Sequence, residues 1–201
     1  MPERKAHVID DDEDARESLA FLLEAADVPV QTYPSARAFL AVAAEARGVV
    51  VTDVRMPEMD GLELVRRLKQ QGVTLPVIVM TGHGDVPLAV EAMKAGVVDF
   101  IEKPFDDVTM LGAIRSAFAR ESQDEPQSGE RTEFIRRIAT LSVREHQVLD
   151  GLVAGKANKV IAYDLDISPR TVEIYRANVM TKMQARSLSE LVRMALVAGV
   201  A

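Results

Sequence analysis

The residues of this sequence whose types and spacing could do chemistry begin with a dense acidic cluster. In VIDDDED, residues 8–14, an apolar run passes directly into five acidic residues. One interpretation is structural, because carboxylates cap the first turn of a helix and favour the positive end of its dipole. The other is chemical, because crowded carboxylates repel one another unless a cation lies between them. The stretch alone leaves both interpretations open.

The elements that must position these acids alternate between strand and helix. Short β-branched runs predict strands at residues 6–10, 30–33, 49–53, 77–81 and 97–101, with helix-like apolar spacing between them. Five strand–helix units predict an α/β fold in which helices cover both faces of a parallel sheet. With right-handed crossovers, about 120 residues fit a flavodoxin-like five-stranded parallel sheet of order 2-1-3-4-5.

In that topology, the carboxyl ends of the first and third strands meet at the crevice where ligands bind. The first expected strand ends at Asp10 and the third at Asp53. The fourth ends at Thr81, and Lys103 follows the fifth. Each of these residues also has an ordinary role open to it, as a turn cap, a strand residue or a surface charge. Their shared position at strand ends predicts one polar site.

Carboxylate and hydroxyl oxygens with room for water suit Mg²⁺ or Mn²⁺. A carboxylate beside such an ion can act as a nucleophile and become an acyl phosphate. Lys103 and the metal would offset charge on the transferring phosphoryl group. Thr81 could hydrogen-bond one phosphoryl oxygen and so report its presence. The pattern predicts metal-assisted phosphoryl transfer to a side chain.

Residues 1–120 resemble the receiver domain of bacterial two-component response regulators, through the acidic pair, DVRMPEMDG, MTGHG and EKPF. This resemblance implies that Asp53 accepts the phosphoryl group. The implied metal site comprises Asp10 (mostly through water), Asp11, Asp53 and the backbone carbonyl of Arg55. The implied phosphoryl-binding and switch residues are Thr81, Lys103 and Phe100. A cis Lys103–Pro104 bond is also implied, and residues 12–14 then suit a first helical turn.

The acidic cluster is also compatible with another class of protein, a phosphatase. DDDED also satisfies D-x-D, the nucleophile loop of Mg²⁺-dependent haloacid-dehalogenase-type phosphatases. That interpretation makes Asp10 the nucleophile, although this pattern normally has Thr or Val where this chain has Asp14. It also leaves the MPEMDG loop and the second half of the chain unexplained.

Composition divides the chain into modules. ESQDEPQSGERTE, residues 121–133, has no apolar residue and predicts a linker. The net charge is −7 over residues 1–120, −3 over 121–136 and +3 over 137–201. We therefore expect a receiver, a linker and a second domain with these three boundaries, and an acidic and a basic module with different partners.

Composition also restricts the classes of chemistry. The chain has no cysteine, so disulfides and thiolate chemistry are excluded. Its three histidines are far apart in the sequence and lack metal-ligand spacing. No run reaches the roughly 18 apolar residues of a spanning helix, and MPERKAHVID lacks the apolar segment of a signal peptide. These features predict a cytoplasmic protein without a membrane segment.

The second module predicts a small all-α domain of four helices. Their expected starts are Ser142, Asn158, Ser168 and Ser187, the last forming a capping box with Glu190. A short helix, a tight turn and a longer helix form the helix-turn-helix arrangement, whose second helix enters the major groove. Residues 140–183 resemble LuxR/NarL-type DNA-binding domains throughout.

Two groups of DNA contacts follow. The residues expected to face base edges are Glu173, Ile174 and Ala177, with Arg176 nearby. Glutamate can accept from cytosine N4, and isoleucine or alanine can touch a thymine methyl. The candidate phosphate contacts, which position the protein without reading sequence, are Asn158, Lys159, Arg170, Thr171 and Lys182. Solvated surface is the alternative for Arg170 and Lys182.

These features together predict a phosphorylation-activated transcriptional regulator that is not an enzyme, since its phosphorylation and autodephosphorylation occur only in cis. Its expected partners are a sensor histidine kinase, double-stranded promoter DNA, RNA polymerase and a second copy of the chain. Residues 81–96 and 168–184 resemble most closely the response regulators of nitrogen-fixation and microaerobic genes. A receiver whose output module binds a protein or RNA is the alternative.

Overall fold

The computed structural model describes residues 4–82, 86–121 and 128–200. Contacts between residues separate two compact units. The described part of the first unit is residues 4–82 and 95–121, and that of the second is residues 86–94 and 128–200. No helix in these described ranges is both long and apolar enough to span a bilayer.

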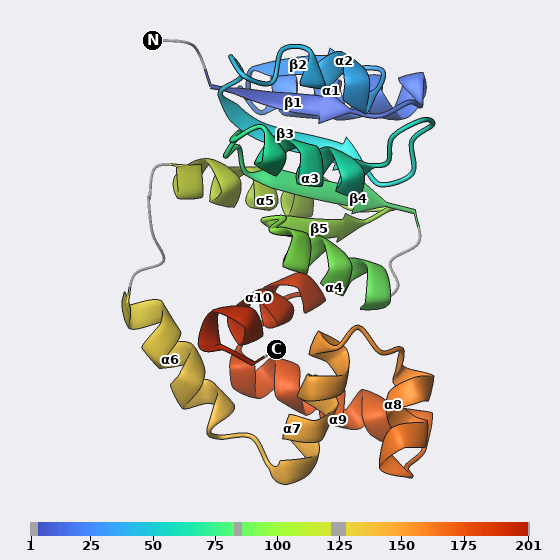
Figure 1. Ribbon diagram of the computed structural model, residues 1–201, viewed down its shortest axis with the longest axis vertical. Helices are drawn as coiled ribbons and strands as arrows, with labels where there is room; N and C mark the ends of the chain where they lie inside the picture. Colours follow the sequence, from blue (N-terminus) through green and yellow to red (C-terminus); the bar gives the residue numbers. More distant parts are fainter. Residues whose placement is uncertain (1–3, 83–85, 122–127, 201) are drawn as a thin grey trace. The chain divides into compact units, whose positions relative to one another are not determined.

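The first unit contains a parallel sheet of order β2-β1-β3-β4-β5 (Figure 1). Its strands are β1 (Lys5–Ile9), β2 (Val30–Tyr33), β3 (Gly48–Asp53), β4 (Val77–Thr81) and β5 (Asp99–Glu102). The expected strand order is therefore confirmed, although β1 ends one residue before Asp10. Every residue of β3 and β4 is buried, because both faces of a parallel sheet are covered and each strand must be apolar throughout.

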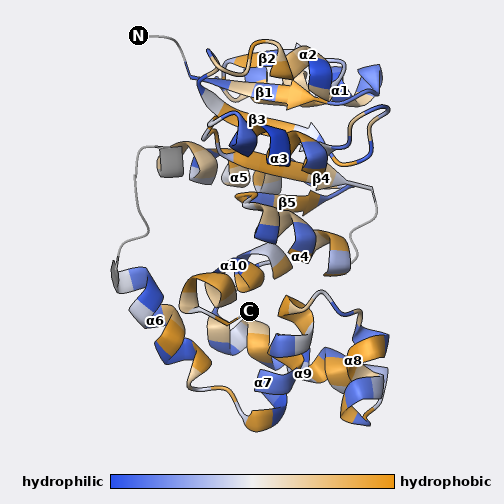
Figure 2. Cartoon of the chain, in the orientation of Figure 1, coloured by the Kyte–Doolittle hydropathy of each residue, from blue (hydrophilic) through white to orange (hydrophobic). Residues whose placement is uncertain are grey.

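The helices of the receiver segment are α1 (Glu13–Ala25), α2 (Ala36–Leu40), α3 (Gly61–Gln70), α4 (Val86–Ala95) and α5 (Asp107–Glu121). On one face of the sheet, Leu23 of α1 and Ile114 of α5 pack with Val51 and Ile78 of the central strands. Figure 2 shows that β1 and β4 are predominantly hydrophobic, which is what this buried position requires.

A buried histidine joins β1 to its neighbours. His7 Nε2 lies 3.1 Å from the carbonyl oxygen of Arg47, and Nδ1 lies 3.2 Å from the hydroxyl of Tyr33. A carbonyl only accepts, so Nε2 carries a hydrogen, and in the neutral ring Nδ1 accepts from the hydroxyl. Burial lowers the pKa of His7, although the hydrogen bond with the Arg47 carbonyl partly opposes this shift.

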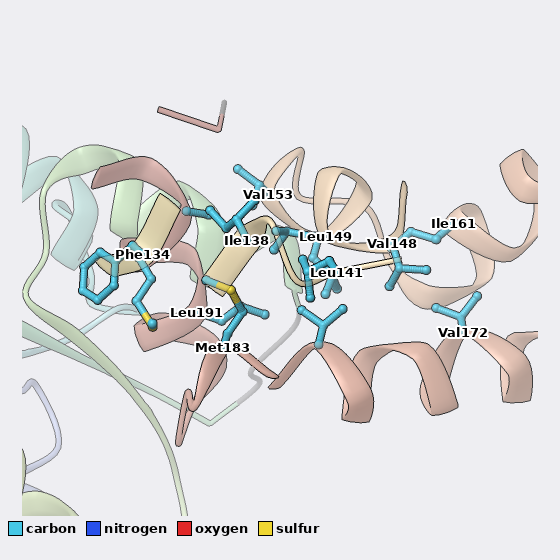
Figure 3. Close-up of a cluster of buried hydrophobic side chains, with 14 of the residues drawn as sticks. Phe134, Ile138, Leu141, Val148, Leu149, Val153, Ile161, Val172, Met183 and Leu191 are labelled. Atoms are coloured by element: carbon cyan, nitrogen blue, oxygen red, sulfur yellow. The ribbon is translucent and has the colours of Figure 1, made fainter. Parts of the chain in front are cut away.

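The second unit contains helices α6 (Ser128–Ile138), α7 (Val143–Val153), α8 (Asn158–Leu165), α9 (Pro169–Met183) and α10 (Leu188–Ala198). The four helices expected over residues 140–198 are confirmed as α7, α8, α9 and α10. Helix α6 lies before them, and its start at Ser128 falls within the segment expected to be a linker. Phe134 and Ile138 of α6 are buried in the core of this unit (Figure 3). Arg137 of α6 also donates to the carbonyl oxygen of Met183 at 2.8 Å. Residues 122–127 of the expected linker lie outside the described residues.

Capping residues start these helices where the sequence indicates. Ser142 and Glu145 form a reciprocal capping box at α7. At α10, the side chain of Ser187 accepts from the Glu190 amide, as expected. The Glu190 carboxylate, however, accepts from the amide of Arg186 at 2.8 Å, one residue before the N-cap. The expected capping box is therefore wrong in its second half, because the carboxylate reaches past the N-cap amide.

The buried histidine predicts a pH-dependent stability. Because the folded protein binds the His7 proton more weakly than the unfolded chain, the free energy of unfolding should decrease as pH falls below about 6.5. One proton contributes a slope of at most ~1.4 kcal/mol per pH unit. Urea unfolding of wild type and His7→Gln between pH 5 and 7.5 should show a smaller slope in the variant, which keeps a donor and an acceptor but does not titrate. Equal slopes would contradict this assignment.

Candidate functional site

Asp53, the last residue of β3, lies at the carboxyl edge of the sheet with 8% of its surface exposed. Its Oδ2 accepts from the Arg55 amide at 2.6 Å. Its Oδ1 accepts from Lys103 Nζ at 2.7 Å. The carboxylate is therefore held from both sides, and its orientation is fixed before any ligand arrives.

Lys103 connects Asp53 to the acidic cluster. Its Nζ also donates to Oδ2 of Asp10 at 2.8 Å, and Asp10 is 3% exposed. One ammonium therefore bridges two buried carboxylates. Partial burial acts to lower the pKa of Lys103, but the hydrogen bonds and negative charges of Asp10 and Asp53 outweigh burial and raise it. Lys103 is consequently a cation throughout the neutral pH range.

A glycine allows the following helix to approach Asp53. The amide of Gly61, the first residue of α3, donates to the carbonyl oxygen of Val54 at 2.9 Å. A Cβ at this position would lie 2.3 Å from the backbone oxygen of Asp53. Any larger residue would therefore displace either α3 or the end of β3. This explains why the MPEMDG loop ends in glycine.

The switch candidates lie on the neighbouring strands. Thr81 is fully buried at the end of β4, and its carbonyl oxygen accepts from the Lys103 amide at 2.7 Å. Phe100 is half-buried on β5 and pairs in register with Val79. The Lys103–Pro104 bond is cis, as the resemblance implies. Residues 83 and 84, the end of the MTGHG motif, lie outside the described residues.

The acidic cluster contains residues with two different roles. Asp10 belongs to the crevice with Lys103, whereas Asp12 is the N-cap of α1, and its Oδ1 accepts from the Ala15 amide at 3.0 Å.

The third acid of the cluster, Asp11, is exposed. The described residues contain no group of three or more acidic or histidine side chains spaced to hold a metal, so Asp11 is not brought together with Asp10 and Asp53. Mg²⁺ needs only one or two protein carboxylates, with water in its other positions. The two carboxylates that Lys103 bridges are therefore a donor set that fits this ion.

The second candidate site is the helix-turn-helix of α8 and α9. Helix α8 ends at Leu165, its C-cap Asp166 has φ 53° in the left-handed region, and α9 begins after the N-cap Ser168. Val172, Val179 and Met183 of α9 are fully buried. This buried stripe fixes which face of α9 remains outside, and the tight turn sets its angle to α8.

The residues expected to face bases lie on that outer face. Glu173, Ile174 and Ala177 are exposed, and 56% of the Ile174 surface is accessible. Arg176 is half-buried. Ile174 is therefore accessible for the apolar contact with a thymine methyl that the sequence predicts.

The candidate phosphate contacts differ from one another. Lys159 and Arg170 are exposed, whereas Thr171 is half-buried and shares a 2.8 Å hydroxyl hydrogen bond with Ser168 at the N-cap of α9. Asn158 starts α8, and its Oδ1 is buried without a hydrogen-bond partner. The exposed cations are therefore the ones placed to meet a ligand without rearrangement.

Lys182 already has an internal partner. Its Nζ donates to Oε2 of Glu145 at 2.6 Å, and this carboxylate is almost fully buried. The hydrogen bond from Lys182, with that from the Ser142 amide, lowers the pKa of Glu145. Sequence analysis did not identify Glu145, although the S-x-x-E spacing at Ser142 indicates a capping box. Its partner lies 37 residues away and leaves no local signal.

Comparison with known proteins identifies the family of each domain. Residues 6–115 match the response regulator receiver domain, and residues 139–195 match the bacterial regulatory proteins of the luxR family. The chain belongs to the response regulators. The transcriptional regulatory protein FixJ of Azorhizobium caulinodans is 61% identical over 203 residues, which cover 100% of this chain and 96% of that protein. FixJ of Rhizobium meliloti is 54% identical over 99% of this chain and 98% of its own length.

A solved structure extends the likeness to the whole architecture. Full-length FixJ from B. japonicum has 51% identity, covers 100% of both chains and gives a TM-score of 0.58. This chain is therefore a FixJ-type response regulator, a transcriptional regulator controlled by phosphorylation, with a receiver domain and a LuxR-family helix-turn-helix domain. It is not an enzyme that turns over a separate substrate.

Proposed function

We propose that Asp53 is the phosphoacceptor of this response regulator and that a sensor histidine kinase, of the FixL-like kind, is the donor. The observation that carries this is the Lys103 ammonium between Asp10 and Asp53, at 2.8 and 2.7 Å. It places a fixed positive charge beside the carboxylate that must receive a phosphoryl group. Mg²⁺, or Mn²⁺, when bound, neutralises charge on the phosphoryl oxygens.

The chain's own residues have distinct parts in the transfer. An Asp53 oxygen attacks phosphorus while the bond from phosphorus to the donor's imidazole nitrogen breaks. The proton on the other ring nitrogen of the donor lets it leave as neutral imidazole, and Asp53 becomes an acyl phosphate. Lys103 can then exchange a carboxylate partner for a phosphoryl oxygen. Asp10, Asp53 and the carbonyl of Arg55 would hold the cation, with Asp10 acting mostly through water. Asp11 is exposed in the structure, so it would join them only by turning its side chain toward the crevice.

We propose that phosphorylation is read through Thr81 and Phe100 on adjacent strands. Thr81 accepts the Lys103 amide through its carbonyl oxygen, so a change at Lys103 is transmitted directly to β4. The receiver then forms a homodimer, which brings two helix-turn-helix domains to paired half-sites. In a cytoplasmic setting, the dimer binds promoter DNA, contacts RNA polymerase and activates nitrogen-fixation or microaerobic genes.

At the DNA, Glu173, Ile174 and Ala177 read base edges, with Arg176 beside them. The proposed backbone contacts are Asn158, Lys159, Arg170, Thr171 and Lys182. For Lys182, contact with a phosphate requires exchange of the Glu145 carboxylate, which is its partner in the structure. Lys182 is therefore the weakest member of the group, and Lys159 is the one on which a test should rest.

The phosphoacceptor can be tested by intact-protein mass after incubation with acetyl phosphate, with and without Mg²⁺. We expect one added phosphoryl group in wild type, dependent on Mg²⁺ and absent from Asp53→Asn. The matched control is Asp60→Asn, which removes an exposed acid from the same loop and should still be modified. An adduct that persists in Asp53→Asn but disappears in Asp10→Asn would favour the phosphatase-type alternative.

The backbone contact of Lys159 should appear in the salt dependence of DNA binding. Replacing it by alanine removes one released counterion, so the slope of log affinity against log salt should fall by about one unit on every sequence. Fluorescence anisotropy on a promoter fragment measures this slope. Lys156→Ala is the control, because Lys156 is engaged by Asp164 at 2.7 Å. An unchanged slope in Lys159→Ala would remove its phosphate role, and absence of DNA binding would favour the protein- or RNA-binding alternative.

Base reading by Glu173 has a different signature. Replacing it by alanine removes an acceptor for cytosine N4 but also a carboxylate that phosphates repel. We expect preference at one base position to relax by about 1–3 kcal/mol while preferences elsewhere are kept. Selection from a randomised operator library measures the profile. A profile identical to that of wild type would show that Glu173 reads no base.

A further inference from the structure

Asp10 has each of its polar atoms engaged by a different partner. Its amide donates to the Tyr33 carbonyl at 3.3 Å. Its Oδ1 accepts from the Asp12 amide at 3.0 Å, and its Oδ2 accepts from Lys103 at 2.8 Å. The remaining atom, the main-chain carbonyl oxygen, accepts from Nη1 of Arg16 at 2.8 Å. The proposed phosphoryl transfer assigns no part to this last bond.

The carbonyl of Asp10 lies just past the sheet ladder. Residue-by-residue pairing of β1 with β2 and with β3 ends at Ile9. Beyond that point the main chain turns toward α1, and Arg16 is the side chain that closes the turn. A half-buried guanidinium therefore fixes the peptide that carries the Asp10 carboxylate.

Arg16 is an unusual residue at this position in the helix. It is the fourth residue of α1, near the end where the helix dipole is positive and where anions are favoured. Asp12, Glu13 and Asp14 follow that preference and Arg16 opposes it. A cation kept there needs a compensating interaction, and the bond to the Asp10 carbonyl supplies one. Within the described residues, Arg16 forms no ion pair with the surrounding carboxylates, so it leaves their charge available.

We propose that Arg16 is a positioning residue for the divalent-cation site. By holding the main chain of Asp10, it keeps the carboxylate aimed at the crevice that Asp53 shares. A carboxylate that meets a hydrated cation through water depends on such support, because nothing in the cation's own shell fixes its direction. This inference rests on the metal site of the proposed function.

The alternative roles of Arg16 predict different changes in the dissociation constant of the cation when Arg16 is removed. As a nearby positive charge alone, it repels the cation, so its removal would tighten binding. As part of the fold alone, its removal would lower the melting temperature and leave the dissociation constant of the folded protein unchanged. As a positioning residue, its removal weakens cation binding by about 10-fold.

The experiment is a Mn²⁺ titration of the full-length protein, followed by the electron paramagnetic resonance signal of free Mn²⁺. Arg16→Met keeps an unbranched side chain and donates nothing, and its dissociation constant should rise about 10-fold over wild type. Arg16→Lys, which retains the charge and a donor, should recover part of the loss. Arg66→Met removes the same charge from an exposed position on α3 and should bind as wild type does.

Melting temperatures from circular dichroism accompany each titration, so that every constant is measured on folded protein. A constant that is unchanged or lowered in Arg16→Met overturns the proposal, whatever the melting temperature does. If wild type binds Mn²⁺ no better than Asp53→Asn, the metal site itself is wrong, and the inference fails with it. Tight wild-type binding that Arg16→Met retains would reject the role of Arg16 alone.

Discussion

The receiver depends on one ammonium that separates two buried carboxylates. Asp10 follows β1 and Asp53 ends β3, and both lose most of their hydration at the edge of the sheet. Without Lys103 their charges would repel across a site that water screens poorly. A buried ion pair is weak evidence for stability, because desolvation offsets its attraction. What the bridge does provide is orientation, since it fixes both carboxylates and links three strands through their ends.

The rest of the first unit supplies the conditions for that bridge. Apolar strands such as β3 and β4 are rigid because both of their faces are packed. Gly61 lets α3 approach the carbonyl of Asp53 more closely than any residue with a Cβ would allow. Arg16 and the Arg55 amide act on the two carboxylates from the main-chain side. The position of each acid is therefore determined by several elements. In the proposed function, a new phosphoryl group is accommodated by exchange of partners at Lys103.

The sequence predicts those features of the fold and the site that depend on local patterns, and it fails for those that depend on contacts between residues far apart in the chain. Strand order and the convergence of Asp10, Asp53, Thr81 and Lys103 were predictable, because periodicity and crossover handedness are local signals with few global solutions. Residues 128–133, the first turns of α6, were predicted to be linker because they contain no apolar residue. The helix is stabilised by Phe134 and Ile138, which pack in the core. These are tertiary contacts, and the polar composition of the preceding residues gives no sign of them.

The partners of single charged side chains were the hardest feature to predict from the sequence. Lys182 has the type and position of a phosphate contact, yet Glu145 on another helix binds it. Arg16 lies within an acidic stretch and suggests an ion pair, yet it bonds a carbonyl. In both residues, the choice between partners is decided by distances of a few ångströms that sequence spacing does not encode. The sequence predicted which charged residues lie together only where strand ends determine their positions.

The two units use charge in opposite ways, and this difference follows from burial. In the receiver the charges are enclosed and paired, so salt screens them little and the geometry is set in advance. On α8 and α9 the cations Lys159 and Arg170 are exposed, and in the proposed function they meet their partners only when DNA binds. Binding of that kind is dominated by counterion release and is sensitive to ionic strength. Salt concentration should therefore have little effect on the geometry of the receiver site. The affinity of the helix-turn-helix domain for DNA, in contrast, should depend strongly on salt concentration.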